Sequence, residues 1–179
     1  MIVTLASRIQ ARIVPVILLA SLSVALLGGC AALRGGQSVD GAVLGIETLP
    51  GVASANVSQI TTLSGFKRIW TTTVAITLEP DYRIDDAEAA LDWAMHTAWS
   101  VNDNEPNLGI SVGFLDSSGN TADWDWQTAA SALGYDSPSV GALMTATGTL
   151  SFGPSVLGDT LGPWPGDVPE LADGVIVAD

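Results

Sequence analysis

The segment 68–79, RIWTTTVAITLE, limits the possible folds more than any other part of the chain. It is rich in β-branched residues and alternates between two faces, a pattern typical of a strand with one side against a core. The segment 51–63 before it also alternates, and Ser64 and Gly65 supply a turn between the two. The pattern therefore predicts a β-hairpin. The core-facing side of its second strand is predicted to be Trp70, Thr72, Val74, Ile76 and Leu78.

Two helices are predicted on either side of this hairpin. The apolar spacing in residues 40–49 suits a short helix that is capped by Asp40 and ended by a Pro-Gly pair. In residues 85–101 a clear helical periodicity predicts a longer helix. Asp85 and Glu88, three residues apart, form a capping-box arrangement at its start.

A second hairpin is predicted after the longer helix. Residues 108–116 suit a strand, and DSSGN at 116–120 suits a turn. TADWDW at 121–126 alternates, so it predicts a returning strand with both tryptophans on one face. A short helix is expected over 127–133, where a glycine follows.

The order helix, hairpin, helix, hairpin predicts an α+β sandwich over residues 40–152, with the helices on one face of an antiparallel sheet. The order resembles a ferredoxin-like fold that starts at its first helix and adds the missing strand as part of a hairpin. LPGV at 49–52 is also similar to the helix–strand junction of small ferredoxin-like metal-binding modules. Those modules place two cysteines before the helix, and this chain has none there, so their copper chemistry is not implied.

The C-terminal segment 153–179 is predicted to be a Gly/Pro-rich extension. Residues 141–152 suit a strand of the domain, and residues 174–179 suit a terminal strand. Residues 153–170 between them are predicted to be irregular. Loops of this length are usually functional or mobile, and the sequence leaves both interpretations open.

The first residues of the chain have the features of a leader. Residues 1–12 carry two arginines and no acid, and the fifteen residues 13–27 are apolar or small. Fifteen helical residues span about 22 Å, less than the ~30 Å hydrocarbon core of a bilayer. We therefore expect a secretory signal peptide over residues 1–29, and a permanent transmembrane helix is the less favoured alternative.

The run Leu27, Gly28, Gly29, Cys30 resembles the lipobox of bacterial lipoproteins. The resemblance implies cleavage between Gly29 and Cys30, a diacylglyceryl group on the Cys30 thiol, and anchoring on the extracytoplasmic face of the cell membrane. Two acyl chains hold a protein stably, whereas one does so only marginally. Cys30 is the only cysteine, so it cannot form an internal disulfide. Residues 30–39 are then a flexible tether, and a soluble secreted protein is the alternative.

The part of the chain after Cys30 is strongly acidic. It carries all 19 acidic residues and four of the six basic ones, a net charge of about −15. Nucleic acid is excluded as a partner, because no basic patch can neutralise phosphates. Repulsion from anionic lipid head groups favours a domain held away from the bilayer, and the simplest role of the charge is solubility.

The candidate metal ligands are few, and we predict no metal site and no cofactor. His96 is a lone histidine on the longer helix and is interpreted as a surface residue. Asp103, Asn104 and Glu105 lie in VNDNEP, which resembles the calcium-binding linker of cadherins. This copy lacks the leading Asp and a second repeat, so it is a weak calcium candidate and otherwise a helix stop. The turn 116–120 resembles half of an EF-hand loop without its closing Glu.

Trp164 is the candidate ligand contact. It lies in the sequence GPWPG within the irregular segment, where an aromatic ring would be free to stack on a sugar or a peptide. Burial of this ring against the domain would make the segment a strap instead. The tryptophans on the predicted helix and second hairpin are assigned to the core and its rim.

No catalytic motif is present in the sequence: there is no G-x-S-x-G, no phosphate loop and no H-E-x-x-H. The chain is therefore expected to be a non-enzymatic lipoprotein that binds an unknown envelope protein or glycan, or takes part in envelope assembly. The alternatives are a carboxylate-based cell-wall hydrolase and a calcium-dependent adhesion module.

The lipobox interpretation predicts the mass of the mature protein. Mass spectrometry of protein from its native membrane is expected to find a chain that begins at Cys30 and carries a diacylglyceryl group on sulfur. An unmodified Cys30, or a product that retains Met1, would contradict the anchor.

Overall fold

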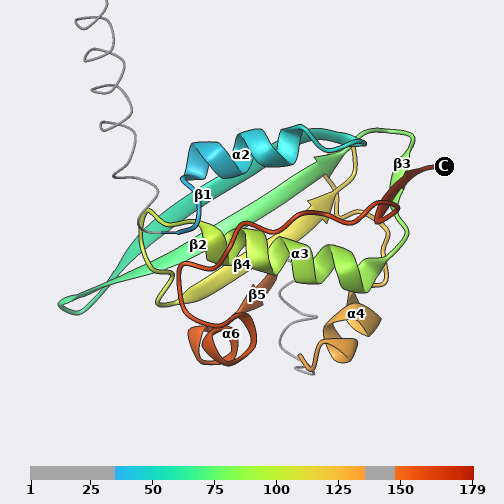
Figure 1. Ribbon diagram of the computed structural model, residues 1–179. Coiled ribbons are helices and arrows are strands. Elements are labelled where there is room, and N and C mark those ends of the chain that lie inside the picture. Colours follow the sequence, from blue (N-terminus) through green and yellow to red (C-terminus); the bar gives the residue numbers. More distant parts are fainter. Residues whose placement is uncertain (1–34, 136–147) are drawn as a thin grey trace, which may run out of the picture. The chain divides into compact units, whose positions relative to one another are not determined.

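The computed structural model describes residues 35–135 and 148–179 (Figure 1). The predicted signal peptide, the lipobox with Cys30 and the first part of the tether lie outside the described residues. So does most of the predicted strand over 141–152. Gly36–Asp179 form one unit with a common hydrophobic core. Among the described helices, none is long and apolar enough to cross a bilayer.

The predicted hairpin at the start of the domain is confirmed. Strand β1, Val52–Ser64, pairs antiparallel with β2, Lys67–Leu78, in a register that places Val57 opposite Val74. The side of β2 predicted to face the core does so, although Trp70 at its outer end is only partly buried. The buried members are Thr72, Val74, Ile76 and Leu78.

Helix α2, Val39–Glu47, precedes the hairpin and is capped by Ser38. The Ser38 Oγ accepts a hydrogen bond from the Gly41 N–H at 3.0 Å. The prediction of Asp40 as the cap was therefore wrong by two residues. Asp40 lies inside the first turn, where its charge favours the positive end of the helix dipole.

Helix α3, Ala87–Ser100, lies inside the predicted range 85–101. Its cap is Asp86, whose Oδ1 accepts from the Ala89 N–H at 3.0 Å. The predicted capping box was wrong by one residue, because the Asp85 carboxylate forms an ion pair with Arg83 instead.

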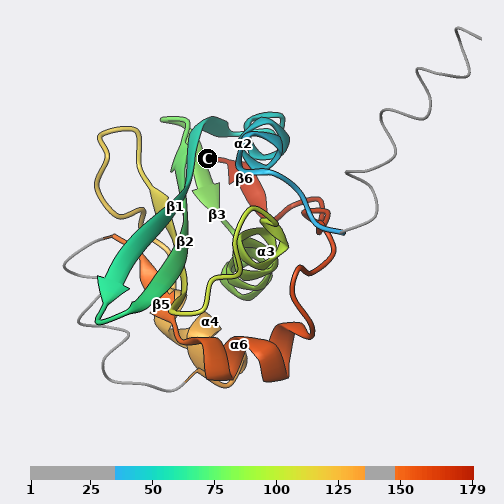
Figure 2. The ribbon, with the colours of Figure 1, turned by 90° about the vertical axis from the view of Figure 1, so that its left-hand side faces the viewer.

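The sheet is mixed. Strand β4, Gly109–Leu115, lies parallel to β2 and antiparallel to β5, Leu150–Phe152, so the strand order is β1-β2-β4-β5. Helix α3 returns the chain to the starting end of β2, and this crossover makes the β2–β4 pairing parallel. Helices α2 and α3 cover one face of the sheet (Figures 1 and 2). The predicted α+β sandwich is confirmed, and two of the three pairings are antiparallel as expected.

The predicted strand over 121–126 is absent. Residues 122–125 belong to no strand or helix, but Ala122 and Trp124 are buried and Asp123 is exposed, so the predicted alternation of faces is present. Within the described part of the chain, the β-pairing of this segment is an isolated bridge between Leu115 and Thr121. Asp125 then caps helix α4, Trp126–Ala132, which agrees with the predicted short helix and takes Trp126 out of the expected strand.

The C-terminal segment contains more structure than the sequence indicated. Helix α6, Pro154–Leu161, occupies part of the segment expected to be irregular, and its Leu157 is fully buried. Pro154 suits the first helical turn, where no N–H partner is needed. The terminal strand is confirmed as β6, Ile176–Ala178. It pairs with β3, Tyr82–Ile84, in a separate two-stranded sheet that the sequence did not indicate.

The observed cap of α3 predicts which of two adjacent aspartates stabilises the helix. Asp86→Ala is expected to lower the free energy of unfolding by about 1 kcal/mol, because the Ala89 N–H loses its acceptor. Asp85→Ala, which removes an exposed ion pair and the same charge, is expected to cost about 0.5 kcal/mol or less. Urea denaturation of both variants measures the difference, and equal losses would contradict the assigned cap.

Candidate functional site

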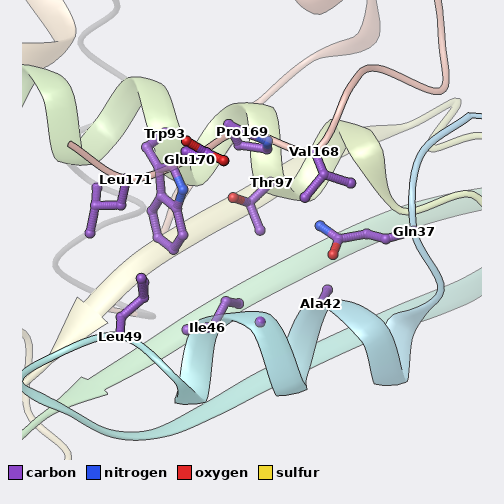
Figure 3. Close-up of a pocket in the computed structure, with 11 residues that line it drawn as sticks. Gln37, Ala42, Ile46, Leu49, Trp93, Thr97, Val168, Pro169, Glu170 and Leu171 are labelled. Atoms are coloured by element: carbon purple, nitrogen blue, oxygen red, sulfur yellow. The ribbon is translucent and has the colours of Figure 1, made fainter.

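A pocket of about 310 Å³ lies where α2, α3 and residues 168–171 meet (Figure 3). Most of its wall is apolar. Ala42 and Ile46 come from the buried face of α2, and Leu49 follows that helix. Val168, Pro169 and Leu171 come from the C-terminal segment, which runs along α3 (Figure 1).

Two polar side chains of α3 belong to this wall and lack partners. Trp93 is 7% exposed and Thr97 is 2% exposed, yet among the residues that the structure describes the Trp93 Nε1 and the Thr97 Oγ1 have no hydrogen-bond partner. The two residues are four apart on one helix, so they lie on the same face. Figure 3 shows both side chains directed from α3 toward α2. A buried polar atom without a partner costs about 1–3 kcal/mol of stability. The pocket wall therefore holds two hydrogen-bonding groups that do not stabilise the fold.

Gln37 adds an amide at one side of the pocket. Its Nε2 donates to the Ser100 Oγ at 2.7 Å, and the Ser100 hydroxyl donates to the Thr97 carbonyl at 2.7 Å. This chain of hydrogen bonds fixes the orientation of the Gln37 amide. Its carbonyl oxygen is therefore a fixed acceptor in the pocket wall. Among the described residues that line the pocket, Glu170 is the only one with a carboxylate.

We call residues 162–171 the strap, because hydrogen bonds fasten them to α3 and their last four residues line the pocket. The Trp164 Nε1 donates to the Val101 carbonyl at 3.1 Å, and the Trp99 Nε1 donates to the Gly162 carbonyl at 3.1 Å. The Gly166 N–H also donates to the Trp99 carbonyl, at 3.3 Å. These bonds fix the first part of the strap at the C-terminal end of α3. The last part of the strap, residues 168–171, forms one side of the pocket.

Trp164 is therefore partly buried against the domain and lies outside the pocket lining. Its N–H is occupied by the chain itself. The indole holds the strap, and its role as a ligand contact stays a prediction.

Two of the three calcium candidates, Asp103 and Asn104, are engaged with other parts of the fold. The Asp103 Oδ2 accepts from the Val39 N–H at 3.5 Å, at the start of α2. The Asn104 Nδ2 donates to the Gln59 Oε1 at 3.2 Å, and the Asn104 carbonyl accepts from the Gln59 Nε2 at 2.7 Å. The described residues contain no group of three or more His, Cys, Asp or Glu side chains that could hold a metal. The calcium interpretation of Asp103, Asn104 and Glu105 gains no support from these contacts.

Two other sequence features have structural roles. His96 lies on the partly exposed side of α3, with its Nε2 3.8 Å from the Asp92 Oδ1. The 116–120 segment is a turn, as expected: the Asp116 Oδ1 accepts from the Asn120 and Ser118 N–H groups at 2.9 and 2.8 Å. The hydrogen bond from the Asn120 N–H is the main cause of a lowered pKa of the Asp116 carboxyl.

An acidic hollow of about 470 Å³ bears on the hydrolase alternative. It is lined by Asp86, Glu88 and Asp92, and Asp86 is engaged as the cap of α3. Within residues 35–135 and 148–179 no Asp or Glu is buried. A general acid at neutral pH needs a raised pKa, which burial commonly provides. The hollow therefore offers no support for the hydrolase alternative.

Comparison with known proteins adds no family to this description. No protein-family model matches the chain, and neither the curated proteins nor the solved structures contain a match.

Sequence reasoning placed Trp93 with the core and did not single out Thr97. One signal was available: α3 is apolar around more of its circumference than a single sheet can cover. Nine of its fourteen residues are buried, so a second layer must cover the helix. The sequence did not show which segment forms that layer, because the strap lies more than sixty residues further along the chain.

The unpartnered hydroxyl predicts an unusual effect on stability. Thr97→Val preserves shape and removes the unsatisfied group, so it is expected to raise the free energy of unfolding by about 1 kcal/mol. Ser100→Ala removes a buried hydroxyl three residues away that has two partners, and it is expected to lower the free energy by about 1–2 kcal/mol. Urea denaturation of the two variants provides the comparison. A loss in Thr97→Val as large as that in Ser100→Ala would mean that the Thr97 hydroxyl has a partner.

Proposed function

We propose that this protein is an extracytoplasmic lipoprotein, anchored through a diacylglyceryl group on Cys30, whose domain binds a small ligand without catalysis. The pocket between α2, α3 and the strap is the proposed binding site. The observation that carries the proposal is the pair of polar groups, Trp93 Nε1 and Thr97 Oγ1, that lack a partner among the described residues and lie in a mostly apolar wall.

The pocket specifies the chemistry of the ligand. A volume of about 310 Å³ is at the lower end of small-molecule sites. The apolar wall suits an aliphatic or aromatic body. The Trp93 Nε1 only donates and the Thr97 hydroxyl donates or accepts, so the matching ligand group is a carbonyl or hydroxyl oxygen. Glu170 and the acidity of the whole domain disfavour an anion.

Binding then recovers free energy that the folded protein leaves unused. Hydrogen bonds between the ligand and the two buried groups replace those that the groups lost on folding. The strap forms one side of the pocket and must yield for entry, since the two polar atoms are closed to water. An envelope protein or a glycan remains the proposed macromolecular partner, and nucleic acid is disfavoured by the charge.

The proposal is tested with small neutral probes. Cyclic ketones and alcohols that fit the pocket are titrated against the protein while the six indole N–H signals are followed by NMR. The Trp93 signal is expected to move downfield as its N–H gains an acceptor. The Trp164 signal is expected to stay in place, because its N–H is already bonded.

Substitutions then separate specific from general binding. Thr97→Val is expected to weaken ketone binding about five- to tenfold, the loss of one hydrogen bond. Its effect on a hydrocarbon of the same shape is expected to be small. An unmoved Trp93 signal at saturating probe, or equal affinity for ketone and hydrocarbon, would contradict the site.

A further inference from the structure

The β1–β2 hairpin extends beyond the rest of the sheet. Strand β4 pairs with β2 only from Thr71 onward. Beyond that point β2 pairs with β1, and the loop before β4 bonds to its Trp70 and Arg68 backbone through Asn107 and Leu108. The pairs from Thr61 with Trp70 to Ser64 with Lys67 span three residue steps, about 10 Å, and the turn lies beyond them. Figure 1 shows this end of the hairpin projecting from the domain.

The projecting end is apolar where folding does not require it. Phe66 in the turn is fully exposed, and Leu63 beside it is 72% exposed. Ile60, on the opposite face of the ribbon from Leu63, is more than half exposed. Contiguous exposed apolar side chains usually mark a surface that contacts another phase or partner. We call residues 63–68 the hairpin tip.

The charge of the hairpin tip is opposite to that of the domain. Lys67 and Arg68 directly follow Phe66, and they are two of only four basic residues after Cys30. Both are exposed, and among the described residues neither forms an ion pair. An aromatic ring flanked by free cations matches the interface of an anionic bilayer, where the ring enters the acyl boundary and the cations meet phosphates.

The hairpin tip lies at the end of the domain where the chain enters. Gln37 exchanges backbone hydrogen bonds with Ser100 and Asn102 at the end of α3. The loop that follows Asn102 reaches the base of the projecting hairpin, where the Asn107 Oδ1 accepts from the Trp70 N–H at 2.8 Å. Cys30 precedes Gln37 by seven residues, which span at most about 25 Å. An anchor at Cys30 therefore keeps this end within reach of the membrane.

We infer that the hairpin tip docks the domain on an anionic lipid surface. Phe66 and Leu63 enter the interface, and Lys67 and Arg68 bind lipid phosphates. A projection of about 10 Å matches the 5–10 Å depth at which interfacial apolar groups are buried. Repulsion still acts on the acidic remainder of the domain, so only this end approaches the bilayer. The orientation of the domain on the membrane rests on the proposed anchor at Cys30, whereas the chemistry of the hairpin tip does not.

A local fluorescent probe tests the inference in the full chain. Ser64→Cys places a thiol in the hairpin, and an environment-sensitive dye is attached to the protein purified from membranes. Ser117→Cys, in the exposed turn at the other end of β4, is the matched control. The labelled proteins are reconstituted in vesicles of phosphatidylcholine, with and without phosphatidylglycerol.

The dye at residue 64 is expected to shift to shorter wavelength and to be quenched by nitroxide lipids, whereas the dye at 117 keeps its emission in water. Phe66→Ser is expected to abolish the shift. Replacing Lys67 or Arg68 by Gln is expected to reduce docking on phosphatidylglycerol vesicles about fivefold per residue. No shift at 64, equal shifts at both positions, or a shift that appears only when envelope proteins are added would overturn the inference.

The two proposals fail separately. A diacylglyceryl group occupies the Cys30 thiol, so the anchored protein takes one dye and an unmodified protein takes two. Two dyes would contradict the anchor and not the tip, and the measurement at residue 64 is then repeated in a Cys30→Ser background.

Discussion

The structure depends on the enclosure of helix α3. Leu91, Met95 and Ala98 are among its fully buried residues, and it also packs on β2, β4 and α4. Burying a large apolar side chain contributes about 1.5–3 kcal/mol, so this helix is a major source of stability. A sheet covers only one side of a helix. The sides that face away from the sheet are covered by α4 and the strap, with α2 alongside, and this requirement accounts for the return of the C-terminal segment along α3 (Figure 1).

The same enclosure creates the candidate site. Where the strap crosses, it closes over α3 without filling the space toward α2, and it leaves Trp93 and Thr97 with unused polar atoms. A core selected for stability alone would hold apolar side chains at these positions. Such a loss of stability is expected where buried polar groups bind a ligand. Groups that are already fixed in place lose little conformational entropy when the ligand binds.

The charge distribution gives the domain two different ends. The chain after Cys30 has a large net negative charge and is repelled by an anionic membrane, whereas the hairpin tip combines Phe66 with Lys67 and Arg68. A tether alone would leave the domain free to rotate. A second contact at the tip would restrict that rotation and hold the pocket in a fixed relation to the bilayer.

The sequence by itself determined the elements whose cause is local. Alternation fixed the first hairpin, periodicity fixed α3, and capping chemistry located both helix starts to within two residues. Local signals also placed the short helix α4 and the terminal strand β6. Local sequence signals did not determine strand direction, because the parallel pairing of β2 with β4 depends on where α3 returns the chain. Nor did they determine strand pairing, because residues 121–126 alternate but form only an isolated bridge among the described residues. Helix α6 was hidden by glycines and prolines that suit its ends. Only the tertiary structure decided the site, because the Trp93 Nε1 and the Thr97 Oγ1 lose their hydrogen bonds through the approach of segments distant in sequence. Which polar groups go unpaired is a property of packing, and no local pattern of residues records it.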